Sequence, residues 1–188
     1  LLLLWSIVPP QSVFRSIEEL RPGHVRVYHR GRHTEKAIWQ AHYPESPDLA
    51  SQFRGSLDEA VDRVRQALDE ATSLRMLRAD VPVGSYLSGG LDSSLVAALG
   101  RRLAGDKFHT FSLRFADAEY DETSYQRLMV ERLGSEHFEI VVGRSDIARV
   151  FPDVVWHAER PILRTAPAPL FLLSKLVHEK GIKVVLTG

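Results

Sequence analysis

The sequence contains no cysteine, which excludes a disulfide framework, a thiolate nucleophile and a thiolate zinc site. It has no excess of charge of either sign, because 24 lysine and arginine residues balance 24 aspartate and glutamate residues. It also lacks a long hydrophobic run: the apolar start LLLLWSIV ends at Val8, well short of the roughly 20 residues that cross a bilayer, and carries no basic flank. We therefore expect no nucleic-acid partner, no membrane partner and a cytoplasmic location, with recognition confined to a specific site.

The chain is long enough to form a globular domain with an appendage. It has 188 residues, of which 44% are hydrophobic. Residues 1–43 are rich in Pro, Arg and His, and HVRVYH alternates with the period of a strand. The following YPESPDLAS is typical of a linker. We expect one division covering residues 1–50 and a second covering 51–188, and the missing initiator Met and the ending KVVLTG suggest a piece of a longer protein.

Beyond the linker, helix and strand patterns alternate. Apolar residues at three- and four-residue spacing from Leu57 to Leu74 predict an amphipathic helix with Ser56 as its N-cap and its apolar stripe in the core. Strands are expected at 81–87, 108–115, 138–142 and 182–186, and helices at 93–103, 122–133, 147–157 and 170–179. This order predicts an α/β fold: a parallel sheet with helices on both faces.

The stretch SGGLDSS follows the first of these strands and precedes a helix. Its glycines allow backbone N–H groups to approach an oxyanion, the helix offers its positive end, and the hydroxyls of Ser88, Ser93 and Ser94 are further donors. Such a cradle favours phosphate. In open α/β sheets, ligands bind beyond the carboxyl ends of the strands, which is where this stretch falls.

Asp92 is the discordant member of this stretch. A carboxylate repels phosphate unless a divalent cation lies between them, so the pattern indicates a nucleotide or pyrophosphate with Mg²⁺. The Lys-Ser/Thr pair of a Walker A loop is absent, and so is the GxGxxG pattern of a dinucleotide loop. The simpler alternative is an exposed turn with Asp92 capping the helix. His137 and His157 lie far apart without a cysteine partner, which favours core or helix-end roles over metal ligation.

Together with its flanks, this loop resembles the pyrophosphate-binding loop of the asparagine synthetase family. SGGLDSS follows LRADVPVGSYL, and further similarity lies in DETSYQRLMVERLGSEHFEIVV, HTFSLRF and GIKVVLTG. The segment IVPPQSVFRSIEELRPGHVRVY is similar to the end of the glutaminase-like domain that precedes the synthetase domain. The resemblance implies an adenine nucleotide alpha hydrolase-like, Rossmann-like fold in truncated form, with residues 1–50 as the glutaminase-domain tail and linker, and 51–188 as the N-terminal part of an ATP-pyrophosphatase domain.

The resemblance also implies roles for individual residues. Tyr86, Leu87, Leu113 and Gly188 would flank adenosine, Glu159 would face the substrate, and Asp92 would bind Mg²⁺. The β- and γ-phosphates of ATP would lie against Ser88, Gly89, Gly90, Asp92, Ser93 and Ser94. Arg164 stands where related sequences often carry Asp, which puts the acceptor pocket in doubt.

The activity implied is adenylation of a carboxylate, aspartate in the asparagine synthetase reading, with release of pyrophosphate and attack by ammonia from a glutaminase domain. This chain would lack a complete catalytic set and be inactive by itself, and a homodimer is left open. Two alternatives stay open: a relative that closes a β-lactam or an isopeptide bond, and a nucleotide-binding module without turnover.

Overall fold

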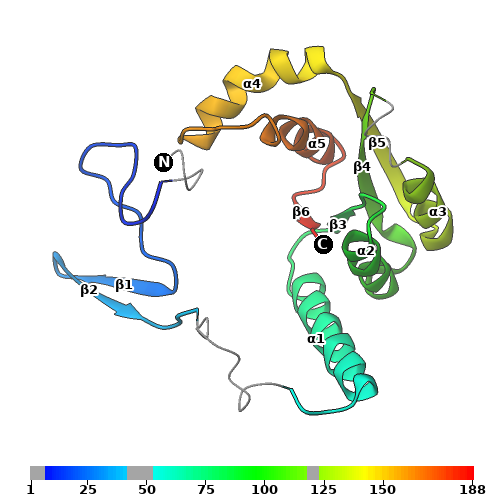
Figure 1. Cartoon of the computed structure of the whole chain (residues 1–188), viewed down its shortest axis with the longest axis horizontal. Coiled ribbons are helices and arrows are strands. Elements are labelled where there is room, and N and C mark those ends of the chain that lie inside the picture. Colours follow the sequence, from blue (N-terminus) through cyan, green and yellow to red (C-terminus); the bar gives the residue numbers. More distant parts are fainter. Residues whose placement is uncertain (1–6, 42–52, 118–122) are drawn as a thin grey trace. The chain divides into compact units, whose positions relative to one another are not determined.

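A computed structural model of the chain describes residues 7–41, 53–117 and 123–188 and shows two compact units (Figure 1). The first, called here the N-terminal unit, comprises Leu1–Arg54 and Val155–Arg164. The second, the sheet unit, comprises Gly55–Val154 and Thr165–Gly188. The expected linker YPESPDLAS and the apolar start LLLLWS lie outside the described residues.

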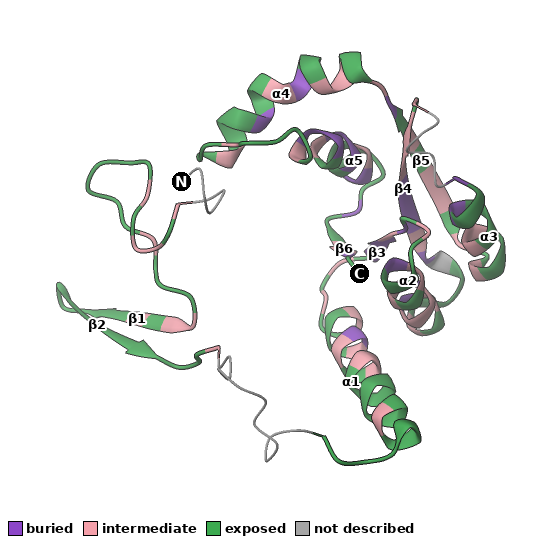
Figure 2. Cartoon of the chain, viewed as in Figure 1, coloured by how far each residue is buried: buried purple, intermediate pink, exposed green. Residues whose placement is uncertain are grey.

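The N-terminal unit contains an antiparallel hairpin of β1 (His24–His29) and β2 (Arg32–Ala37). The alternation in HVRVYH predicts β1, and the structure confirms it. Gly23, with φ +70°, begins the hairpin beside Trp39, whose backbone N–H donates to the Gly23 carbonyl at 3.1 Å. None of the described residues of this unit is buried, as the absence of purple on β1 and β2 in Figure 2 illustrates.

The sheet unit is built on a parallel four-stranded sheet in the order β5-β4-β3-β6. The strands are β3 (Val83–Tyr86), β4 (His109–Phe115), β5 (Glu136–Val142) and β6 (Val184–Leu186). The four expected strands are therefore all present, and their parallel pairing confirms the predicted α/β class.

Helices cover both faces of this sheet. Between the strands run α2 (Leu91–Ala104), the short 3₁₀ turn η1 (Gly105–Lys107), α3 (Thr123–Leu133), α4 (Arg144–Ala158) and α5 (Pro167–Glu179). On the α5 side, Phe111 of β4 packs with Leu173 and Val177. A separate core cluster unites Leu87 and Ala97 with Phe108, Met129 and neighbouring side chains of α3. In Figure 1, α5 and the α2–α3 pair lie on opposite sides of the strands.

The helix α1 (Leu57–Leu77) begins as predicted but is not buried as predicted. Ser56 Oγ accepts a hydrogen bond from Glu59 N, and the Glu59 carboxylate accepts one from Ser56 N, which completes a capping box. The apolar stripe, however, is largely exposed: Leu57 is 78% exposed and Val64 59%. The expectation of a core stripe is wrong because α1 packs mainly on α2, and no described element covers its outer side.

Candidate functional site

The candidate site lies where the sheet changes its direction of winding. From β3 the chain passes through α2 to β4 and through α3 to β5, and it then returns to place β6 on the other side of β3. In open α/β sheets the crevice at such a switch point, outside the carboxyl ends of the strands, is the usual ligand site. The β3–α2 loop (residues 87–90) follows β3 at this edge of the sheet, and β6 is paired with β3 beside it.

Gly89 gives the β3–α2 loop its shape. Its φ of +86° is disfavoured for residues with a side chain. A Cβ atom placed there would lie 3.0 Å from Gln126 N and 3.1 Å from Tyr125 Cβ, so α3 also leaves no room for one. Gly90, by contrast, is the N-cap of α2 with an ordinary φ of −72° and has only Ser88 Oγ, at 3.4 Å, near an added Cβ.

Two serine hydroxyls stabilise the loop from within. Ser88 Oγ and Ser93 Oγ lie 2.8 Å apart, Ser93 Oγ accepts from Ser88 N at 3.2 Å, and it donates to Gly90 O at 3.2 Å. Gly90 N in turn donates to Ser88 Oγ at 3.3 Å. Since each hydroxyl has a single proton, Ser93 uses its own on Gly90 O and Ser88 then donates to Ser93. In this conformation both hydroxyl protons are used in hydrogen bonds within the loop and the first turn of α2. Backbone N–H groups are then the donors that remain for a ligand.

The first turn of α2 supplies such donors. Ser94 N donates the first helical bond, to Gly90 O at 3.1 Å, so the N–H groups from Leu91 to Ser93 precede the helical ladder. The N-cap Gly90 offers no side-chain cap. This end of α2 therefore combines uncapped N–H groups with the positive end of a helix dipole, which is the arrangement that binds anions.

Asp92 and Gly188 border one cavity of about 520 Å³ beside this turn. The cavity is enclosed by α1, α2 and the end of β6, and its lining is Leu68, Ala71, Thr72, Arg75, Asp92, Leu95, Val96, Val185, Leu186, Thr187 and Gly188. Gly188 lies so close to α2 that a Cβ there would be 2.4 Å from Ser93 N. The lining contains a single carboxylate, Asp92, and a single guanidinium, Arg75.

The residues expected to flank adenosine lie at the carboxyl edge of the sheet. Leu87 is buried, its N–H donates to Phe111 O at 2.8 Å, and its carbonyl accepts from the Ser112 hydroxyl. Tyr86 is half-buried, and its hydroxyl lies 3.1 Å from Ser174 Oγ of α5. The Leu113 carbonyl accepts a hydrogen bond from Gln126 Nε2 at 3.2 Å. The sheet thus brings these residues near the loop, while contact with adenosine stays a prediction.

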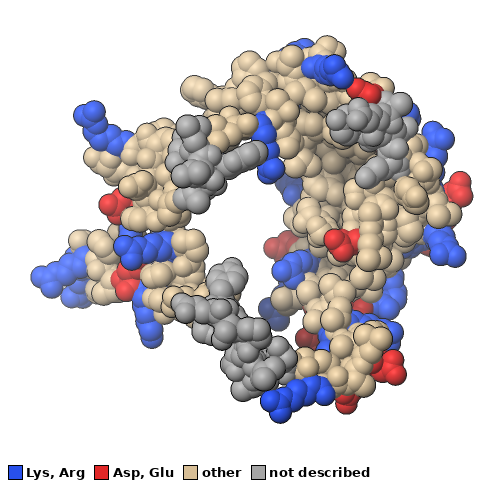
Figure 3. Space-filling model, in the orientation of Figure 1, with Lys and Arg blue, Asp and Glu red and all other residues tan. Residues whose placement is uncertain are grey.

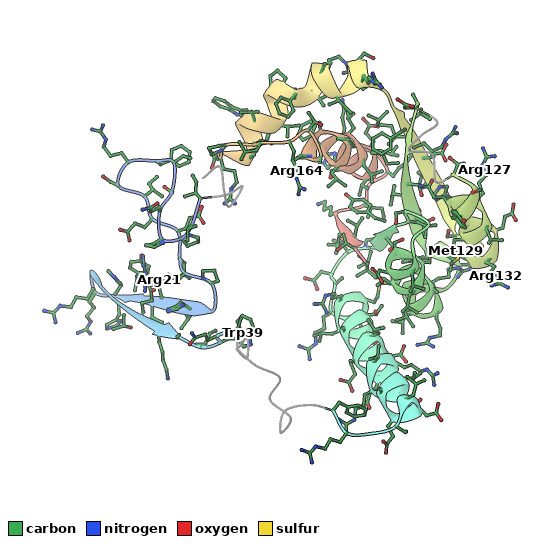
Figure 4. The ribbon with its side chains drawn as sticks, in the orientation of Figure 1. Arg21, Trp39, Arg127, Met129, Arg132 and Arg164 are labelled. Carbon is green, nitrogen blue, oxygen red and sulfur yellow. The ribbon has the colours of Figure 1, made fainter. Side chains whose placement is uncertain are left out.

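Glu159 and Arg164 belong to the N-terminal unit and are exposed there. Glu159 follows α4 with a φ of +50°, and Arg164 lies on the segment between α4 and α5 (Figure 4). The substrate-side role of Glu159 therefore stays a prediction.

Gln126 and Arg75 are site neighbours that sequence reasoning missed. Gln126 of α3 is only 4% exposed, and its Nε2 donates to the carbonyls of Ser88 and Leu113. Arg127 and Arg132 of the same helix are exposed, whereas Met129 packs into the core (Figure 4). Residues 126 and 129 are three apart and share one face of the helix, so the pattern that places residue 129 inward also indicates burial of residue 126. It does not show which backbone groups the amide of residue 126 contacts.

A second cavity, of about 730 Å³, lies at the ends of β4 and β5 and is lined by Phe115, Ala116, Asp117, Val142, Gly143, Arg144 and Ile147. At its edge Asp146 accepts a hydrogen bond from Gly143 N at 3.0 Å and pairs with Arg149. These contacts, the Gly143 bond first, lower the pKa of the Asp146 carboxyl. A carboxylate therefore already occupies the start of α4, which makes this end unlike the uncapped α2.

The two histidines considered as metal ligands have other surroundings. His137 Nδ1 lies 3.0 Å from Thr110 Oγ1, and burial lowers the pKa of its imidazole. His157 lies near the end of α4 in the N-terminal unit. In residues 7–41, 53–117 and 123–188, no three His, Asp or Glu side chains gather as a metal site.

Surface charge is mixed. On the face drawn in Figure 3, Lys and Arg atoms alternate with Asp and Glu atoms over the sheet unit, in line with equal numbers of both signs. Within the described segments, no helix combines the length and apolar character that crossing a bilayer requires.

Comparison with known proteins decides the family. The profile described as asparagine synthase matches residues 63–188, which include the β3–α2 loop, α2 and all four strands of the sheet. The chain belongs to the asparagine synthase family. The expected resemblance is thereby confirmed for most of the sheet unit.

Individual relatives of this asparagine synthase family chain carry different names. Amidase chyE of Penicillium rubens is 33% identical over 199 residues, covering 98% of this chain and 29% of the relative. Asparagine synthetase [glutamine-hydrolyzing] 1 of Bacillus subtilis is 33% identical over 135 residues, covering 70% of this chain and 20% of the relative. The chain thus spans less than a third of the length of these relatives.

Among solved structures, an NH3-dependent NAD synthetase from Campylobacter jejuni, in complex with the nitrate ion, aligns with 68% of this chain and 56% of its own. The sequence identity is 17% and the TM-score 0.45.

Proposed function

We propose that this chain is the nucleotide-binding part of an ATP-dependent, amide-forming ligase, and that the β3–α2 loop and the start of α2 hold the pyrophosphate moiety of ATP. The observation that carries the proposal is the joint placement of an uncapped helix start, a positive-φ glycine and Asp92 at the switch point of a parallel sheet. Membership of the asparagine synthase family supports it.

The loop suits an anion better than a neutral ligand. With the Ser88 and Ser93 hydroxyls engaged in the loop, the donors toward a phosphate are the Gly89 N–H and the backbone N–H groups at the start of α2. These groups are fixed by the fold and need little reorganisation when charge develops on a leaving pyrophosphate, which is the electrostatic condition for catalysis. Gly188 keeps the end of β6 against this turn and so closes one side of the crevice.

Asp92 fits a magnesium ion that is shared with phosphate. Mg²⁺ is usually bound by one or two carboxylates together with substrate phosphates and waters, so a single protein carboxylate in the cavity is sufficient. When bound, the ion would neutralise negative charge on the pyrophosphate. Without a cation, Asp92 would oppose phosphate binding by like-charge repulsion.

In the whole protein, the proposed reaction joins a carboxylate to ammonia. A carboxylate oxygen attacks the α-phosphorus of ATP, the bond from that phosphorus to the bridging oxygen breaks, and pyrophosphate leaves with the bond electrons. Ammonia then attacks the acyl carbon, loses a proton and displaces AMP. The chain's residues act by positioning and charge stabilisation, since no protein nucleophile is needed. The ammonia source proposed is a glutaminase domain, and the carboxylate is aspartate in the asparagine synthetase reading.

A related amide-forming reaction on another carboxylate is the second candidate. Two relatives, from Penicillium rubens and Gibberella zeae, are named amidases and match 98% and 96% of this chain. An amidase acts on an amide bond, so these names indicate amide chemistry other than asparagine formation among the relatives. They fit a different amide substrate only in part, and the β-lactam and isopeptide alternatives remain within this second candidate.

The first test is binding of inorganic pyrophosphate to this chain by calorimetry, with and without Mg²⁺. We expect Mg²⁺ to strengthen pyrophosphate binding. Asp92→Asn should remove most of that gain, because the variant loses the carboxylate proposed to bind Mg²⁺. The fold should stay intact, because residue 92 is exposed. Asp62→Asn is the matched control, since Asp62 is exposed on α1 and pairs with Arg65 away from the cavity. Equal Mg²⁺ dependence in wild type and Asp92→Asn would remove Asp92 from the site.

The second test is pyrophosphate release by the whole protein, supplied with ATP, Mg²⁺, ammonia and a panel of carboxylates. Release with aspartate alone supports the asparagine synthetase reading, and release with another carboxylate supports the second candidate. Tight nucleotide binding with no release for any carboxylate would contradict both and favour a binding module without turnover.

A further inference from the structure

Gln126 connects two segments that are distant in sequence. Its Nε2 donates to Ser88 O and to Leu113 O, each at 3.2 Å. Ser88 lies in the β3–α2 loop, and Leu113 lies near the carboxyl end of β4. Because a primary amide has two N–H donors, the two carbonyls use the whole donor capacity of this side chain.

The orientation of the Gln126 amide is set by these carbonyls. A flipped amide would place Oε1 against two carbonyl oxygens, so only the observed orientation allows both bonds. Oε1 is buried and has no hydrogen-bond partner within the described segments. In this orientation the two hydrogen bonds of Nε2 offset the free-energy cost of leaving Oε1 without a partner.

This tie controls where a backbone donor of the loop points. In a planar trans peptide, the C=O and the following N–H point in opposite directions. Because Gln126 holds the Ser88 carbonyl toward α3, the Gly89 N–H is turned away from α3. A Cβ added to Gly89 would lie 3.0 Å from Gln126 N, so the loop backbone packs directly against α3. The helix therefore fixes both the direction of the Ser88 carbonyl and the distance between the loop and α3.

We propose that Gln126 is a positioning residue of the nucleotide site: its side-chain amide ties the β3–α2 loop to the end of β4 and so turns the Gly89 N–H of the loop toward pyrophosphate. Its part in ligand binding rests on the proposed function, whereas the tie itself does not. Gln126 acts through the Ser88 and Leu113 carbonyls and is not assigned a contact with the ligand.

The test compares Gln126→Met with wild type, because methionine matches the length of glutamine without its donors. Amide hydrogen exchange at Ser88 in the ligand-free chain reports on the loop, since Ser88 N donates within it. We expect exchange about tenfold faster and affinity for magnesium pyrophosphate about tenfold weaker. A tenfold change corresponds to about 1.4 kcal/mol, which lies within the net contribution of the two hydrogen bonds that the variant loses. Gln66→Met is the matched control, because Gln66 is exposed on α1 and bonds Glu70; it should change neither value.

The outcomes separate the two proposals. If wild type binds magnesium pyrophosphate and Gln126→Met matches it in exchange and affinity, the positioning role is wrong and the proposed function stands. If exchange rises in Gln126→Met but wild type binds no pyrophosphate, the proposed function is wrong and the tie stands. If Gln126→Met does not fold, Gln126→Asn replaces it, because the shorter amide cannot reach both carbonyls; unchanged exchange there would also overturn the positioning role.

Discussion

The hydroxyl groups of Ser88 and Ser93 lie 2.8 Å apart and join the β3–α2 loop to the first turn of α2. Ser93 also accepts from Ser88 N and donates to Gly90 O, so one buried hydroxyl takes part in three hydrogen bonds of the loop. The pair therefore stabilises the conformation in which the backbone of α2 is left open for an anion.

Ser93→Ala should destabilise the sheet unit. The change removes the acceptor of the Ser88 N–H, the partner of the Ser88 hydroxyl and one of the two donors to Gly90 O, which keeps its bond from Ser94 N. A hydrogen bond contributes about 0.5–1.5 kcal/mol net, so we expect a loss of about 1–3 kcal/mol. Urea unfolding followed by circular dichroism measures the loss. Ser94→Ala is the control on the next residue of α2, outside this hydroxyl network, and is expected within about 0.5 kcal/mol of wild type. Equal losses in the two variants would show that the network contributes nothing specific.

The two glycines of the loop should differ in their tolerance of a side chain. Gly89→Ala places a Cβ at φ +86° and against the backbone of α3, so we expect a loss of about 1–3 kcal/mol and weaker pyrophosphate binding. Gly90→Ala should be tolerated, because its φ is ordinary and its surroundings are open.

Gly134→Ala separates backbone strain from crowding. Gly134 has φ +56° and nothing within 4 Å of an added Cβ, so this variant has a positive φ without the contact. A loss in Gly89→Ala no larger than in Gly134→Ala would contradict the role of α3 in shaping the loop.

Most of the sheet unit was predictable because its signals are local. Apolar strands and helix patterns alternate along the chain, and a parallel sheet follows from that order. β2 was not predictable, because RHTEKA is polar and exposed throughout and shows no strand alternation. The stripe on α1 shows a different limit: periodicity identifies the apolar face of a helix but not whether another element covers it.

The place of the candidate site was predictable from the sequence, but the hydrogen bonds within it were not. A glycine-serine stretch between strand and helix marks the carboxyl edge of the sheet. The inward hydroxyls of Ser88 and Ser93 depend on the φ of Gly89, which no pattern specifies. Gln126 reaches Ser88 across 38 residues of sequence, a contact that only the packing of α3 on the sheet creates.

Truncating the exposed stripe of α1 should cost little. Leu57→Ala removes a side chain that is 78% exposed, so a change within about 0.5 kcal/mol is expected. Leu173→Ala, the matched change in α5, removes a side chain that is 3% exposed and should cost about 2–5 kcal/mol. Thermal unfolding of both variants checks the difference. A large loss in Leu57→Ala would mean that another part of the chain buries the stripe in solution.

Stability should fall as the pH drops below neutrality, in part through His137. Burial lowers the pKa of its imidazole in the folded chain, with Glu139 acting in the opposite direction. The unfolded chain, with a His pKa of about 6.5, therefore binds a proton first as the pH falls. Stability is complete above the unfolded pKa and is lost progressively until the pH passes below the folded pKa.

His137→Asn removes this titration while keeping a side-chain oxygen near the position of Nδ1, which contacts Thr110 Oγ1. Between about pH 7 and pH 5, we expect the free energy of unfolding to decline less in this variant than in wild type. This pH range surrounds the ordinary His pKa of about 6.5. The comparison concerns the decline and not the absolute stability of the variant at about pH 8. His178→Asn, at an exposed position on α5, is the control and should retain the wild-type slope. The measurement is urea unfolding across this pH range. An identical slope in His137→Asn and wild type would show that the burial of this imidazole does not contribute to the acid sensitivity of the fold.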